Sequence, residues 1–103
     1  GLAKPISFTT GGKRWRLTWG GNPSLDGEPV DGLCNFEKRK LTIRGGLKPL
    51  SELDTLIHEL SHACHEYLHE DAIDPKSTDI ARVLWRCGYR KLTPEQRRTL
   101  DID

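Results

Sequence analysis

The chain has 103 residues, of which 35% are hydrophobic and 30% are charged, and its formal net charge at neutral pH is +1. This length predicts a single domain over residues 1–103 with a small core. A near-zero charge gives no general attraction to nucleic acid, and no apolar run approaches the roughly 18 residues that a membrane span needs. We therefore expect a globular domain that binds neither membranes nor nucleic acid.

The three cysteines are widely spaced, and no C-x-x-C pair is present. An odd number with such spacing argues against a disulfide framework. The first residues contain no apolar segment of the kind found in signal peptides. We therefore expect reduced thiols and a cytoplasmic location. Cys64 and Cys87 are expected on apolar helix faces as small core residues, whereas Cys34 falls in a strand-rich region.

The N-terminal segment carries strand signals. Residues 6–10 and 14–19 are separated by G-G-K, which predicts two strands joined by a tight turn. In the second of these segments Trp15, Leu17 and Trp19 alternate with polar residues, so one face is apolar. These side chains are expected to face the core.

A loop and a third strand follow. Residues 20–32 are rich in glycine, proline and aspartate, which predicts a loop. K-L-T-I-R at residues 40–44 predicts a strand that forms a hairpin-like element with residues 33–39. The sequence therefore predicts a small, mainly antiparallel sheet.

Three helices are predicted in the second half of the chain. The first begins with Ser51 as N-cap, has acidic residues in its first turn and extends to about Leu68. The second begins at Asp74-Pro75 and ends before Gly88. A capping box that starts at Thr93 opens a short third helix.

All four histidines of the chain fall on one narrow stripe of the first predicted helix. They are His58, His62, His65 and His69. The apolar side chains, with Tyr67 among them, lie on the opposite face. His58 and His62 are one turn apart in an H-E-x-x-H pattern, so both imidazoles can bind one ion. Glu59 can accept a proton from a zinc-bound water and pass it to a leaving amine. The pattern predicts a Zn²⁺ site, and a solvated histidine face is the alternative.

The third protein ligand of such a site is less evident. Asp79 is favoured, because it lies at the margin of the predicted buried stripe of the second helix and can face a cleft between helices. Asp74 and His69 are alternatives, although Asp74 also suits an N-cap and His69 requires the first helix to end before it. The lesser candidates are Glu66, Glu70 and Cys34. The predicted stripe consists of Ile80, Val83, Leu84 and Cys87.

The segment T-L-I-H-E-L-S-H-A after K-L-T-I-R-G-G resembles the zincin metallopeptidases, and in particular small bacterial and phage domains of the SprT-like and ImmA/IrrE-like kinds. The resemblance covers about residues 33–90. It implies a minimal zincin-like α+β fold, in which a small sheet packs on the H-E-x-x-H helix and a second helix carries a ligand. It implies His58 and His62 as zinc ligands and Glu59 as the general base.

The resemblance also implies that the strand before the helix binds extended substrate through its edge. The strand residues concerned are Leu41, Thr42 and Ile43. His65 is a further candidate for a contact with substrate, and Tyr89 is a candidate donor to a developing oxyanion.

Together these features predict a zinc-dependent metallopeptidase that acts on a peptide or protein substrate. A second reading is a zinc-binding module without catalysis in a phage or regulatory assembly, which would suit the small size. A third is a DNA-associated SprT-like protease that uses basic clusters such as Lys38–Lys40, although the near-zero net charge argues against it. The sequence specifies neither the oligomeric state nor the substrate.

Overall fold

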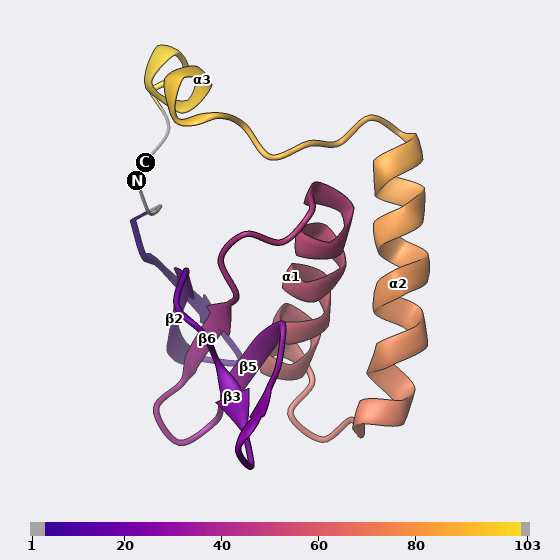
Figure 1. Ribbon diagram of the computed structural model, residues 1–103. Coiled ribbons are helices and arrows are strands. Elements are labelled where there is room, and N and C mark those ends of the chain that lie inside the picture. Colours follow the sequence, from indigo (N-terminus) through magenta and orange to yellow (C-terminus); the bar gives the residue numbers. More distant parts are fainter. Residues whose placement is uncertain (1–3, 102–103) are drawn as a thin grey trace.

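The computed structural model describes residues 4–101 as a mixed sheet with three helices (Figure 1). The sheet has four strands in the order β1-β2-β6-β5. They are β1 Ile6–Thr10, β2 Lys13–Trp19, β5 Gly32–Asn35 and β6 Lys40–Ile43. The pairs β1–β2 and β5–β6 are antiparallel, and the β2–β6 pair is parallel. The prediction of a small, mainly antiparallel sheet is confirmed.

The segment between β2 and β5, which was expected to be a loop, contains a short hairpin. It is formed by β3 (Ser24–Leu25) and β4 (Glu28–Pro29), which are antiparallel. Asp26 and Gly27 at its tip have φ values of 52° and 81°, a left-handed conformation that both residue types tolerate in turns. The hairpin projects beside β5 (Figure 1).

The core lies between the sheet and the first helix. Trp15 and Leu17 of β2, with Leu41 and Ile43 of β6, are at most 5% exposed. Their alternate spacing places all four on one face of the sheet, as the pattern of β2 predicted. Ala63 joins them from the first helix.

The helices add two further layers. Helix α1 (Pro49–Cys64) packs on the sheet, and α2 (Glu70–Arg86) packs on the outer side of α1 (Figure 1). Helix α3 (Pro94–Thr99) has no buried residue. The α+β class is therefore confirmed. No helix within residues 4–101 has the length and apolar character needed to cross a membrane.

Three predicted helix boundaries were wrong. Helix α1 begins at Pro49, whose fixed φ suits the first helical position, and it ends at Cys64 instead of Leu68. Helix α2 begins at Glu70, where two acidic residues complement the positive helix end, so Pro75 lies inside the helix instead of opening it. The capping box at Thr93 is confirmed.

Several burial predictions were also wrong. Tyr67 follows the end of α1 and is 96% exposed. Ile80 and Val83 are 48% and 59% exposed, because α2 turns a different face toward α1. Its buried residues are Ile73, Ser77 and Ala81. Cys64 and Cys87 are exposed, and all three cysteines are free.

Candidate metal centre

The middle of α1 brings two imidazoles and one carboxylate together. The Nε2 atoms of His58 and His62 lie 3.2 Å apart, because the two residues are one helical turn apart on the same face. One ligand atom from each of His58, Glu59 and His62 falls within 4.8 Å of the others, so the group can hold a metal ion. The imidazole side chains are only 14% and 12% exposed. Most of the surface of both imidazole rings is therefore covered by the protein.

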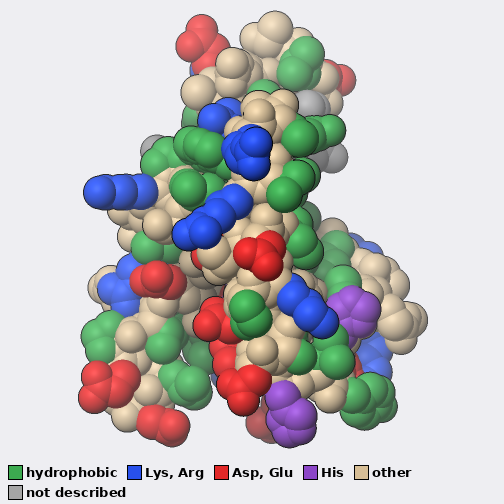
Figure 2. All heavy atoms as spheres, turned by 90° about the vertical axis from the view of Figure 1, so that its right-hand side faces the viewer, with side chains coloured by type: hydrophobic (Ala, Val, Ile, Leu, Met, Phe, Trp, Pro, Cys, Tyr) green, Lys and Arg blue, Asp and Glu red, His purple; other side chains and the backbone are tan. Residues whose placement is uncertain are grey.

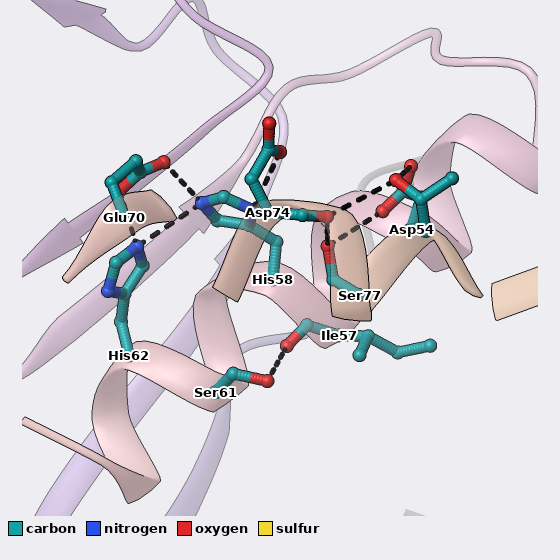
Figure 3. Close-up of polar contacts among 9 residues, drawn as sticks. Asp54, Ile57, His58, Ser61, His62, Glu70, Asp74 and Ser77 are labelled. Carbon is teal, nitrogen blue, oxygen red and sulfur yellow. Dashed lines mark hydrogen bonds and ion pairs between the residues drawn. The ribbon is translucent and has the colours of Figure 1, made fainter. Parts of the chain in front are cut away.

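Glu70, the first residue of α2, faces both histidines (Figure 3). One carboxylate oxygen is 2.7 Å from His58 Nε2, and the other is 2.8 Å from His62 Nε2. The short turn over residues 65–69 reverses the chain and places the start of α2 beside the last turns of α1. Three potential ligands from two helices therefore converge on one point.

Three further polar side chains of α2 contact α1. Asp74, one turn after Glu70, has a carboxylate oxygen 3.5 Å from His58 Nδ1 (Figure 3). A carboxylate on the second nitrogen of a ligating imidazole sets the orientation of the ring. The hydroxyls of Ser77 and Thr78 donate to the carboxylate of Asp54 on α1, at 3.0 and 2.9 Å. These hydrogen bonds fix the register of the two helices.

Glu59 is buried against the edge strand. It is 6% exposed, and a Cβ placed on Gly32 of β5 would lie 2.7 Å from its Oε2. Burial raises the pKa of Glu59 to about 7, with Glu70 adding to the rise and His58 opposing it. A carboxyl group with such a pKa can accept and release a proton near neutral pH.

A cleft of about 430 Å³ opens onto this group. Its walls come from β5 and the segment just before it, from the β3–β4 hairpin, and from the facing sides of α1 and α2. The ring of Phe36 meets His62 edge-on, with 6.3 Å between ring centroids. The cleft in front of the two histidines is thus lined by the β3–β4 hairpin, by β5 and by the two long helices.

The expected edge role of Leu41, Thr42 and Ile43 is wrong. Strand β6 lies between β2 and β5, so both of its edges are already paired. Leu41 and Ile43 are fully buried core residues, and Thr42 accepts a hydroxyl hydrogen bond from Thr18. The edge strand that lines the cleft is β5.

Of the remaining predicted site residues, Asp74 and Cys34 line the cleft, whereas four others lie outside it. Asp79 is exposed and follows Asp74 by five residues, which places it about 140° around the helix from Asp74, the residue that lines the cleft. His65 is the C-cap of α1 and lines a separate cavity, and His69 is the exposed N-cap of α2. Tyr89 is 65% exposed. Glu70, a lesser candidate from the sequence, is the carboxylate that the fold brings to the histidines.

Comparisons with protein-family models, with curated proteins and with solved structures gave no match. The function proposed below therefore rests on the geometry and chemistry of this centre.

Proposed function

We propose that this protein is a zinc-dependent metallopeptidase in which His58, His62 and Glu70 hold the ion. The observation that carries the proposal is the distance of 3.2 Å between the two Nε2 atoms. In tetrahedral zinc sites with Zn–N bonds of about 2.0–2.1 Å, two ligand atoms lie about 3.3 Å apart. Glu70 offers its carboxylate to both nitrogens at once. Three protein ligands leave the fourth position open, as in catalytic zinc sites.

Glu59 is the proposed general base. Zinc held by His58, His62 and Glu70 would supply a bound water with a pKa of about 7 and would polarise a substrate carbonyl. A carboxylate oxygen of Glu59 lies within 4.8 Å of a ring nitrogen of each histidine. In the proposed reaction this carboxylate accepts the proton from the attacking water and passes it to the leaving amide nitrogen.

The free edge of β5 provides a place for an extended substrate. Strand β5 pairs with β6 on one side, and no strand among residues 4–101 covers its other side. A peptide that adds a strand there would form main-chain hydrogen bonds and would lie along the cleft. Gly32 in this strand contacts Glu59, so such a peptide would pass close to the base.

A metal-binding module without catalysis would use the same three ligands. In that case Glu59 would be a buried structural carboxylate packed on Gly32. Replacing Glu59 separates the two functions. A structural role predicts a loss of folding stability, whereas a catalytic role predicts a loss of cleavage rate.

The test combines metal content, stability and cleavage. We expect about one zinc ion per purified chain and a lower melting temperature after chelation. Glu59→Gln should retain zinc but lower cleavage of an unfolded, fluorescently labelled protein by at least about 10²-fold. Asp79→Asn, an exposed change on α2, is the control and should match the wild type.

Either of two results would count against the proposal. A chain that contains no zinc and gains no stability from it does not have the metal site. If the zinc-loaded wild type cleaves no unfolded protein, the peptidase proposal fails and the protein is a metal-binding module without catalysis.

A further inference from the structure

The cleft is strongly acidic although the chain is nearly neutral. Five carboxylates line it, and no lysine or arginine does. They are Asp31, Asp54, Glu59, Glu70 and Asp74. They come from the segment before β5, from α1 and from α2, so no single element accounts for them.

A divalent cation would not neutralise this charge. In the proposed site one of its two positive charges is matched by Glu70. Asp31, Asp54 and Asp74 remain, so the cleft stays net negative even with Glu59 protonated. Charge of one sign within a cleft with low-dielectric walls attracts ligands of the opposite sign.

The Glu59 carboxylate is available to a ligand in the cleft. The residue is 6% exposed and lines the cleft. Within residues 4–101, the enclosed polar side-chain atoms that lack a hydrogen-bond partner are the indole nitrogens of Trp15 and Trp19, so the Glu59 oxygens are open to the cleft. Water or a bound molecule in the cleft can therefore hydrogen-bond to this carboxylate.

Acidic side chains gather on one part of the surface. Figure 2 shows most acidic side chains of that face in the lower half, on the two sides of a hollow, whereas basic side chains occur in both halves. For α2 alone this pattern also complements the helix dipole, with Glu70 and Asp71 in the first turn and Arg86 in the last. The dipole does not account for Asp31, which lies outside any helix.

The surroundings of Asp31 suit a long basic side chain. Leu25 and Val30 line the cleft beside it, so the aliphatic stem of lysine or arginine can lie on them while its charge reaches the carboxylate. Arg44 lies 3.7 Å from Asp31 and offsets part of its charge. The Asp31 side chain is nevertheless 63% exposed and accessible to a second cation.

We propose that the cleft selects extended polypeptide segments rich in lysine and arginine, with one basic side chain directed to Asp31. This inference rests on the proposed function, since it names the substrate class of the same site. Main-chain pairing with β5 would supply affinity that is independent of sequence, and the acidic walls would supply the preference for basic segments.

Binding is measured on the Glu59→Gln variant, which should not cut the probe. The probe is a fluorescein-labelled peptide in which lysine alternates with alanine and leucine, and its partner has glutamate in place of every lysine. By fluorescence anisotropy at low salt we expect the lysine peptide to bind at least about tenfold more tightly, with the difference shrinking as salt is added.

A matched pair of variants locates the effect. Asp31→Asn should weaken binding of the lysine peptide by roughly threefold, because it removes one partly exposed charge from the cleft. Asp79→Asn makes the same chemical change on α2 outside the cleft and should leave binding unchanged. Equal binding of the two peptides, or equal effects of the two variants, would overturn the proposal.

The metal content of the same samples separates this inference from the proposed function. A chain without zinc that still prefers the lysine peptide refutes the peptidase and supports the acidic cleft as a binding site. A zinc-loaded peptidase that cleaves acidic and basic segments equally well refutes only the proposed preference.

Discussion

Replacing Gly32 by alanine tests whether the edge strand positions Glu59. The added Cβ would lie 2.6 Å from Thr55 Cγ2, 2.7 Å from Glu59 Oε2 and 2.8 Å from Glu59 Cγ. No open space is available, because Glu59 is buried and Gly32 is held in register opposite Ile43 of β6. The two side chains of α1 must therefore move, or β5 must separate from the helix.

The size of the effect follows from these distances. Non-bonded carbon atoms are at their optimum at about 3.5–4.0 Å, so the carboxylate has to retreat by roughly 0.7 Å. Overpacking of this kind costs about 1–3 kcal/mol of unfolding free energy. A displacement of about 1 Å in a reacting group can cost about 10²-fold in rate, so we expect Gly32→Ala to lose roughly tenfold to a hundredfold in kcat.

Urea denaturation, zinc content and cleavage of the labelled unfolded protein are measured together. Zinc content should be unchanged, because none of the three proposed ligands contacts the new methyl group. Adding Thr55→Ala to Gly32→Ala removes the contact with Cγ2 but leaves both contacts with Glu59. The double variant should therefore regain part of the stability and little of the rate. Wild-type stability and rate in Gly32→Ala would refute the packing of Glu59 on β5.

Two further substitutions and one labelling experiment test separate parts of the centre. Glu70→Gln should lower zinc affinity at least about tenfold in competition with a fluorescent chelator, whereas Asp79→Asn should not; equal affinities would exclude Glu70 as a ligand. Asp54→Ala removes the acceptor of two hydroxyl hydrogen bonds from α2 and should lower the unfolding free energy by about 1–3 kcal/mol in urea, so an unchanged midpoint would contradict the helix contact. Burial and nearby carboxylates raise the pKa of the Cys34 thiol to about 12, so in metal-free protein iodoacetamide should modify Cys34 more slowly than the exposed Cys87. Equal rates in peptide mapping would show that the Cys34 thiol is not shielded.

The parts of the structure that were predicted correctly depend on short-range patterns. Trp15 and Leu17 face the core because side chains alternate along a strand. His58 and His62 meet because residues four apart share a helix face. Gly88, at a φ of 93°, follows the end of α2 as its position in the sequence predicted.

The end of α1 had no comparable local signal. Neither glycine nor proline occurs between Cys64 and Glu70, and the histidine stripe continues through residues 65–69. Asp74-Pro75 offered a conventional helix start, although the helix had already begun four residues earlier. The acidic pair Glu70-Asp71 was the available signal for the true start. Because this boundary was misplaced, Glu70 was ranked below Asp79.

The predicted orientation of α2, with Ile80 and Val83 facing the core, was also wrong. Its apolar residues Ile80 and Val83 suggested a buried stripe, because hydrophobic periodicity normally marks the inward face of a helix. The inward face is instead partly polar, since Ser77 is 1% exposed and donates to Asp54. Hydrogen bonds from Ser77 and Thr78 to Asp54 thus join the two helices where the periodicity predicts apolar contacts.

This polar face links the packing of α2 to the chemistry of the centre. Glu70, Asp74 and Ser77 follow one another at helical spacing, so they project from α2 on one side. Because α2 runs back along α1, the first of them meets the histidine pair, the second meets His58 Nδ1, and the third meets Asp54 near the start of α1. One stripe thus supplies the proposed ligand Glu70, a carboxylate 3.5 Å from His58 Nδ1, and the contact that sets the helix register. A shift of α2 by one residue would rotate all three away together, so the register that stabilises the helix pair is also the register that assembles the proposed metal site.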